Sequence, residues 1–176
     1  ALASPPWSDR IVRIELDWTP SQSADAYQVD FYRNLFGGYP EYDDAGGSAP
    51  ALPTNPVAEG WTLIKTLQAD ESTTISQPAD RDFYYFCTIT RDSLGNQSAV
   101  VMTTGVPNYL LGDVSNGGLP FVDGDNVVNT ADLTYLGAGY GTTDGDFLYQ
   151  PTLDIGPTSD WSVTGRPTTD NKIDFE

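Results

Sequence analysis

The sequence predicts a mainly β protein in two parts: an antiparallel β-sandwich over residues 1–106 and a small loop-rich module with one short helix over residues 107–176. Before Val106, short β-branched and aromatic runs alternate with turn residues, a pattern typical of sandwiches. After it the chain is rich in Gly, Asp and Asn, with one stretch of helical spacing. Acidic residues also concentrate there: residues 107–176 hold 11 acidic and 2 basic residues, against 14 and 6 in residues 1–106.

Six runs in the first part are predicted to be strands. In the first, Val12, Ile14, Leu16 and Trp18 alternate with polar residues, which is typical of a half-buried strand. The other runs behave similarly, and a turn over residues 93–96 joins the last two. The runs are residues 11–18, 27–33, 61–67, 73–76, 83–91 and 97–104.

Part of this pattern resembles a fibronectin type III module. Trp18 lies on an early strand, Tyr27 on the next, and Tyr84-Tyr85-Phe86 leads to a turn-rich run at residues 92–98. The resemblance covers about residues 8–106. It implies that Trp18 is the buried tryptophan of the family and that Tyr84 is its tyrosine-corner residue.

Two features depart from that family. The strand containing Cys87 can bury either of two alternating sets, Tyr84, Phe86 and Thr88 or Tyr85, Cys87 and Ile89. The connection over residues 34–60 is longer than typical sandwich loops and carries several acidic residues, Glu41 among them. Loops of this length are usually functional or disordered. We interpret it as a solvated insertion, with contact to a partner or a cation as the alternative.

Composition excludes several kinds of function. The chain has no histidine and one cysteine, Cys87, which removes Ser-His-Asp and Cys-His catalysis, imidazole zinc sites and internal disulfides. Its net charge of −17 makes nucleic acid a poor partner. No apolar run approaches the ~20 residues that span a bilayer. The remaining oxygen ligands favour a hard cation such as calcium.

Residues 123–133 have the spacing of an EF-hand calcium loop. Such a loop supplies oxygens from positions 1, 3, 5, 7, 9 and 12, with position 7 acting through its backbone carbonyl. When Asp132 is set at position 12, Asn126 falls at position 6, where a left-handed conformation is wanted. Val128 falls at position 8 and is predicted to anchor the loop to the core. The ligands at positions 3, 5, 7 and 9 are then Asp123, Asp125, Val127 and Asn129.

Position 1 of this loop requires a replacement. Strict counting places Phe121 there, which has no side-chain oxygen. Asp113 takes the position if residues 116–122 loop out, which the glycines and Pro120 in that segment permit. Leu133, Leu136 and Tyr140 then recur at helical spacing, which predicts a helix from Thr130 or Ala131 to Ala138.

The pattern recurs with an offset of 45 residues. Residues 153–156 echo the stretch around Asp113, and residues 168–176 echo residues 123–131. Ile173 corresponds to Val128 as the apolar anchor, and position 12 would fall on the residue after Glu176. The predicted ligands of this second loop are Asp154, Thr168, Asp170, Lys172 through its carbonyl, and Asp174.

Two such loops in tandem resemble a type I dockerin, the module that docks enzymes onto cohesin domains. The resemblance covers about residues 108–176 and is most specific in the first loop. It implies calcium binding and partner contacts at loop positions 10 and 11, here Thr130, Ala131, Phe175 and Glu176. We therefore expect a non-catalytic, extracellular, calcium-binding segment of a larger secreted protein, which docks onto a cohesin-like protein.

Other interpretations stay open at this point. The chain could be a calcium-stabilised subunit that assembles with copies of itself into a surface layer or filament. It could also bind polysaccharide through Trp7, Trp61 and Trp161, although no acid pair stands out for glycoside cleavage. The acidic residues of the run 144–146 and Asp160 are expected in turns rather than as ligands.

Overall fold

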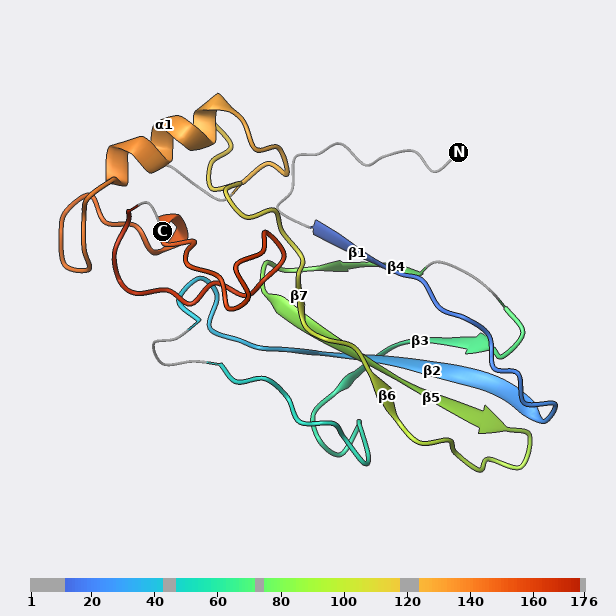
Figure 1. Cartoon of the computed structure of the whole chain (residues 1–176). Helices are drawn as coiled ribbons and strands as arrows, with labels where there is room; N and C mark the ends of the chain where they lie inside the picture. The colour runs from blue at the N-terminus through green and yellow to red at the C-terminus, as the bar shows by residue number, and fades with distance from the viewer. Residues whose placement is uncertain (1–11, 43–46, 72–74, 118–123, 175–176) are drawn as a thin grey trace.

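The computed structural model describes residues 12–42, 47–71, 75–117 and 124–174. In this part of the chain the protein is mainly β, with antiparallel strands and one α-helix, α1 (Thr130–Gly139). The strands occupy the first part of the chain, and the loop-rich second part caps one end of the sheets (Figure 1). No helix in the described segments is long and apolar enough to cross a membrane.

The larger sheet is built around two ten-residue strands. β2 (Ala26–Leu35) pairs antiparallel with β5 (Phe83–Asp92) over almost their whole length. β3 (Thr62–Gln68) adds to the free edge of β2. Two short strands, β6 (Val101–Met102) and β7 (Val106–Pro107), pair with β5. β7 therefore leads the chain directly from this sheet into the second part.

The second sheet has two strands, β1 (Val12–Leu16) and β4 (Ile75–Ala79), paired antiparallel. Ile14 and Leu16 of β1 pack against Tyr84 and Phe86 of β5. Leu16 also packs with the cluster around Val29 and Phe31 of β2. An apolar core therefore lies between the two sheets.

The resemblance to a fibronectin type III module implies buried positions for Trp18 and Tyr84, and the structure differs between the two. Trp18 is only half-buried, and its ring meets the Phe31 ring edge-on at 5.4 Å. Tyr84 is 4% exposed and packs in the core, with the Arg33 guanidinium over its ring. Deep burial is thus found at Tyr84 and not at Trp18.

The sequence left open which of the two alternating sets of β5 side chains is buried. In the structure, both sets contribute buried side chains. Tyr84 and Phe86 face the two-stranded sheet, whereas Cys87 and Ile89 belong to a cluster with Trp61. Trp61 directly follows the long insertion and is 4% exposed. β5 therefore contributes apolar side chains to clusters on both of its faces.

The interpretation of residues 34–60 as a solvated insertion fits residues 47–60, most of which are exposed, and is wrong for the part around Tyr42. Tyr42 is 2% exposed and clusters with Phe83 of β5 and Tyr109. The hydroxyl groups of Tyr42 and Tyr109 lie 3.0 Å apart. Because Tyr109 follows β7, this aromatic cluster joins the insertion, the larger sheet and the start of the second part.

The predicted strands over 27–33, 61–67 and 83–91 agree with β2, β3 and β5. The first ends at Leu16 rather than Trp18, and the fourth extends to Ala79 rather than Ser76. Ile11, Thr73 and Thr74 of these runs lie outside the described residues.

The last predicted run differs most from the structure. Residues 97–104 form only the short β6, and Gln97 makes an isolated bridge with Arg91. The Ser98 hydroxyl accepts the Thr90 amide at 3.0 Å. A side chain thus takes the place of a backbone partner, which is how serine competes with regular pairing.

The predicted helix is confirmed as α1. Asn129 caps it by accepting the Ala131 amide at 2.8 Å. Asp132 completes a capping box by accepting the Asn129 amide, also at 2.8 Å. Such reciprocal caps satisfy amides that a helix start leaves without partners.

Candidate cation-binding loops

The first predicted loop closes through Asp113. This side chain is fully buried at 0% exposure, and its Oδ2 accepts the backbone amide of Asn126 at 2.9 Å. Asn126 has φ 69°, the left-handed conformation expected at position 6. The structure therefore brings Asp113 against the loop, although 13 residues separate it from Asn126.

The second predicted loop repeats this arrangement. Asp154 is 3% exposed, and its Oδ2 accepts the Asn171 amide at 2.8 Å and the Lys172 amide at 3.3 Å. Asn171 has φ 65°. The same pairing of an aspartate with a left-handed asparagine thus forms across an intervening segment of different length.

Both aspartates leave one oxygen buried without a partner. Oδ1 of Asp113 and Oδ1 of Asp154 accept no hydrogen bond in the described part of the chain. A buried carboxylate oxygen without a partner costs free energy. A hard cation is a partner that carboxylate oxygens readily take, so Asp113 and Asp154 can each offer one oxygen to such an ion, and calcium binding stays a prediction.

Asp132 connects the start of α1 to the residues that follow Asp113. Its Oδ1 accepts the amides of Val114 and Ser115, both at 2.9 Å, and its Oδ2 accepts the Asn129 amide. The carboxylate is 2% exposed. These bonds hold the two ends of the first loop together, and coordination of a cation by Asp132 stays a prediction.

The predicted apolar anchor is confirmed in the second loop and wrong in the first. Ile173 is 1% exposed and packs with Leu153 and Tyr135, whereas Val128 is 55% exposed. The reason lies in backbone pairing: the Ile173 amide donates to the Thr142 carbonyl at 3.0 Å and its carbonyl accepts the Gly141 amide at 2.7 Å. The segment after α1 thus draws the second loop into the core.

Four other predicted ligands are half-buried or exposed. Asp125 is half-buried, and its Oδ1 accepts the Val127 amide at 3.0 Å. The Thr168 hydroxyl donates to the Pro157 carbonyl at 2.8 Å. Asp170 is exposed, and Asp174 forms an ion pair with the Lys172 ammonium group.

Electrostatics around the second loop favour a cation. Burial raises the pKa of the Asp154 carboxyl group above its usual value, and the nearby Asp170 carboxylate acts in the same direction. Both effects express the cost of a negative charge at this position. A bound cation would offset that cost and favour the ionised carboxylate.

The described residues form only part of each predicted ligand set. Among them, no three His, Cys, Asp or Glu side chains gather into a metal-binding group. Asp123, Phe175 and Glu176 lie outside the described residues. Thr130 is exposed and Ala131 half-buried at the first turn of α1. The first-position aspartates therefore carry the structural case for these loops.

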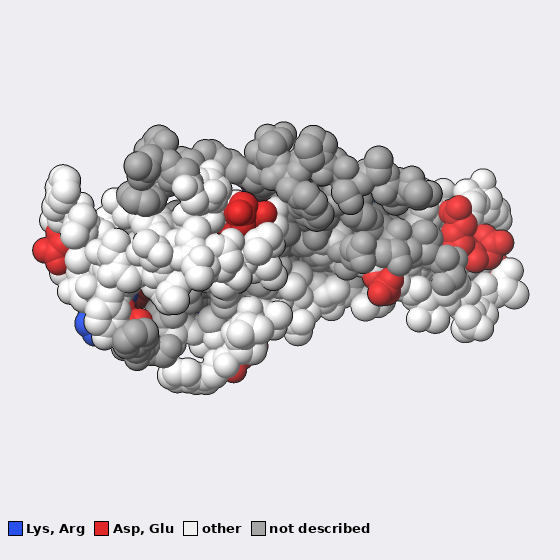
Figure 2. All heavy atoms as spheres, turned by 90° about the horizontal axis from the view of Figure 1, so that it is seen from above, with Lys and Arg blue, Asp and Glu red and all other residues white. Residues whose placement is uncertain are grey.

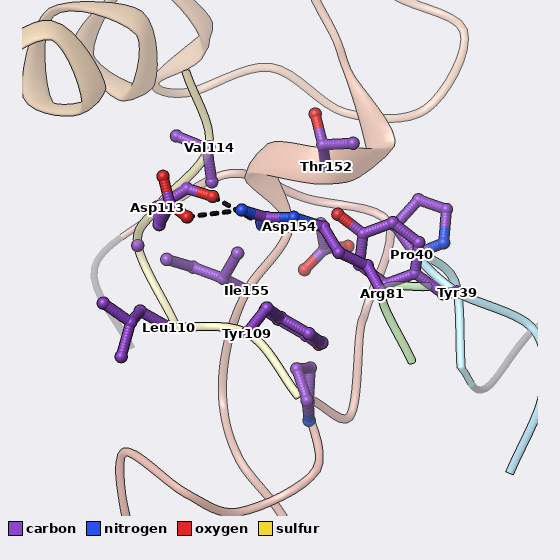
Figure 3. A pocket seen from close by; sticks show the side chains of 12 residues that line it. Tyr39, Pro40, Arg81, Tyr109, Leu110, Asp113, Val114, Thr152, Asp154 and Ile155 are labelled. Carbon is purple, nitrogen blue, oxygen red and sulfur yellow. Dashed lines mark hydrogen bonds and ion pairs between the residues drawn. The ribbon is translucent and has the colours of Figure 1, made fainter. Parts of the chain in front are cut away.

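Sequence reasoning missed Arg81, which reaches the first loop from the β4–β5 connection. Its Nη1 donates to the Asp113 carbonyl at 2.7 Å, and its Nη2 forms an ion pair with Asp113 Oδ2 (Figure 3). Arg81 lies between Asp80 and Asp82, so the local sequence is typical of an ordinary polar turn. Its role depends on a contact across 32 residues that no local pattern signals.

Tyr149 was missed in the same way. Its hydroxyl lies 2.9 Å from Glu41 Oε1 and 3.3 Å from Asp154 Oδ2. Asp113 and Asp154 also line one small cavity of about 10 Å³ together with Arg81 (Figure 3). The β4–β5 connection thus contacts the first loop through Arg81, and the insertion reaches the second loop through Tyr149.

The remaining acidic residues behave as expected for turns. Asp146 Oδ2 accepts the Thr143 amide at 2.9 Å, and Asp160 Oδ1 accepts the Ser162 amide at 3.0 Å. On the face shown in Figure 2, acidic side chains form separate patches rather than one continuous surface. Their distribution does not by itself mark a binding site.

The proposed sugar platforms are only partly accessible. Trp61 is 4% exposed and belongs to the core, whereas Trp161 is 81% exposed. Trp7 lies outside the described residues. Of the described pair, Trp161 alone can offer its ring to a ligand.

Neither a protein-family model, nor a curated protein, nor a solved structure matches this chain.

Proposed function

We propose that this chain is a non-catalytic, calcium-binding structural and docking segment of a larger secreted protein. A fibronectin type III-like sandwich would carry a dockerin-like pair of calcium loops. One observation supports this above all: Asp113 and Asp154 each accept the amide of a left-handed asparagine, and each keeps a second buried oxygen that has no partner among the described residues. Two unrelated turns are not expected to share this arrangement.

Charge supports the assignment of calcium. Residues 107–176 carry 11 acidic and 2 basic residues, a net charge of −9 that opposes compaction of so short a segment. Two divalent ions would neutralise about four of these charges. Metal binding would therefore be coupled to folding of this part.

The docking role is supported by exposed residues around α1. Thr130 is exposed at the first turn, and Val127 and Leu133 nearby are 54% and 68% exposed. A mixed polar and apolar surface beside a calcium loop fits a protein partner such as a cohesin-like domain. The same surface supports the alternative of self-assembly, in which a second copy of the chain covers it.

Calcium titration of the full chain by isothermal calorimetry, after removal of metal with EDTA, tests the proposal. We expect two binding events, one lost in Asp125→Ala and the other lost in Asp170→Ala. Asp25→Ala is the matched control, because Asp25 is an exposed residue that accepts the Ser23 hydroxyl before β2. Limited proteolysis should show that EDTA loosens residues 107–176 and leaves the sheets intact.

Absence of binding heat in the wild type, together with a cleavage pattern indifferent to EDTA, would refute calcium binding. If calcium binds, sedimentation velocity with and without the ion separates the two kinds of partner. Association of the chain with itself in calcium favours the surface-layer or filament alternative. A monomer that binds an immobilised cohesin domain only in calcium favours docking.

A further inference from the structure

The two loops differ in what neutralises the first-position aspartate. In the first loop, the Arg81 guanidinium holds both the carboxylate and the backbone carbonyl of Asp113. Arg81 is 9% exposed and Asp113 is 0% exposed, so this ion pair is buried. A buried carboxylate that has such a partner is held in place without any metal.

In the second loop, the donors to Asp154 found in the described part of the chain are all uncharged. They are the backbone amides of Asn171 and Lys172 and the hydroxyl group of Tyr149. The same hydroxyl lies 2.9 Å from the Glu41 carboxylate, so a second negative charge stands close by. This loop gathers negative charge where the first loop has an internal cation.

We propose that Arg81 is a built-in counter-ion for the first loop, so that removal of calcium opens the second loop and leaves the first closed. The proposal rests on the calcium binding proposed above. Arg81 acts here as a positioning residue, since it holds the carboxylate of Asp113 and contacts no ligand itself.

An unpaired buried charge is costly, and this cost differs between the two loops. Without calcium, the Asp113 carboxylate keeps its guanidinium partner, and its bond to the Asn126 amide persists. Without calcium, the Asp154 and Glu41 carboxylates repel each other across one hydroxyl group, and opening to water relieves that repulsion. The first loop would thus stay closed and keep its contact with the β-sheet half of the chain through Arg81. The second loop would open when calcium is removed.

Amide hydrogen exchange of the full chain, with calcium and in EDTA, tests this difference. In EDTA we expect protection of the Asn171 and Lys172 amides to fall by about tenfold or more, and protection of the Asn126 amide to change by less than about threefold. In Arg81→Gln, which keeps a hydrogen-bond donor and removes the charge, the Asn126 amide should also lose about tenfold in EDTA. Calcium should restore it.

Two variants complete the design. Arg91→Gln makes the same charge change at an ion pair within the larger sheet, where Arg91 Nε lies 2.6 Å from Asp30 Oδ2. It should alter neither loop. Arg81→Lys keeps the charge and should keep the first loop closed in EDTA. If Arg81→Gln does not fold, the wild type and Arg81→Lys still decide the question.

The outcomes separate this inference from the proposed function. Equal loss of protection at both loops of the wild type in EDTA overturns the role of Arg81 and leaves calcium binding standing. If folded Arg81→Gln keeps the wild-type protection of the Asn126 amide in EDTA, the role of Arg81 is also overturned, and calcium binding still stands. Exchange that is indifferent to calcium at both loops, without binding heat, refutes the proposed function itself.

Discussion

The hydroxyl group of Tyr149 lies 2.9 Å from Oε1 of Glu41, although 108 residues separate them in the sequence. Glu41 belongs to the insertion between β2 and β3, and Tyr149 follows α1. The same hydroxyl lies 3.3 Å from Asp154 Oδ2. One phenol therefore connects the β-sheet half of the chain to the second loop.

Tyr149→Phe should destabilise the chain by about 1–2 kcal/mol, because it removes the shared partner of two buried or half-buried carboxylates. Urea unfolding in calcium, followed by circular dichroism, measures the change. Tyr27→Phe is the matched control, since Tyr27 is 52% exposed on β2, and it should cost less than about 0.5 kcal/mol. Equal effects of the two substitutions would show that the Tyr149 hydroxyl contributes nothing specific.

The left-handed asparagines give a second prediction. Asn126→Ala and Asn171→Ala should each cost about 1–2 kcal/mol, because alanine pays a steric penalty at positive φ. Asn126→Gly and Asn171→Gly should cost less, because glycine adopts this conformation freely. Thermal unfolding of the four variants provides the comparison. If alanine and glycine behaved alike at either site, backbone conformation would not be what favours asparagine there.

Local features of the chain were predictable from the sequence, and the contacts between its two parts were not. Alternation located β1 and β5, and the helical spacing of Leu133, Leu136 and Tyr140 located α1. The left-handed conformation at Asn126 also followed from loop spacing. Each of these depends on neighbours a few residues away.

The features that the sequence did not predict depend on residues far apart in the chain. Val128 and Ile173 have equivalent places in the repeat, yet only Ile173 is drawn inside, because the segment after α1 pairs with the second loop. Arg81 reaches the first loop across 32 residues, and Tyr149 links the second loop to Glu41, which lies 108 residues away in the sequence. Periodicity and spacing carry no information about such contacts, since they depend on how finished elements pack.

Gly124 gives a third prediction, because it lies against the Asp113–Arg81 ion pair. A Cβ atom at this position would collide with the Asp113 carboxylate and the Arg81 guanidinium. Gly124→Ala should therefore cost about 1–3 kcal/mol, as expected for overpacking, and should weaken calcium binding at the first loop. Urea unfolding and calorimetry measure the two effects.

The matched control for Gly124 is Gly137→Ala within α1. A Cβ there meets no atom within 4 Å, and alanine favours the helix over glycine by about 1 kcal/mol. This variant should therefore be more stable than the wild type. Destabilisation by both substitutions would contradict the steric explanation for Gly124.

The fourth prediction concerns alkaline pH. Burial raises the pKa of the Cys87 thiol to about 11 from a model-peptide value of 9.0, and the side chain is 1% exposed. The folded state thus holds this proton more tightly than the unfolded state. Its contribution to stability is complete below pH 9.0 and is lost as the pH rises towards 11. The loss amounts to at most about 3 kcal/mol, given 1.36 kcal/mol per pKa unit.

Burial also raises the hydroxyl pKa of Tyr42 and of Tyr109, which adds to the decline above pH 10, where an unfolded tyrosine ionises. Guanidinium unfolding at pH 7, 9 and 10.5 should show a free energy of unfolding that is level up to pH 9 and then falls. Cys87→Ala should reduce the part of the decline that begins near pH 9. At pH 7 a thiol reagent should label Cys87 only as the chain unfolds, and rapid labelling of the native protein would contradict its burial.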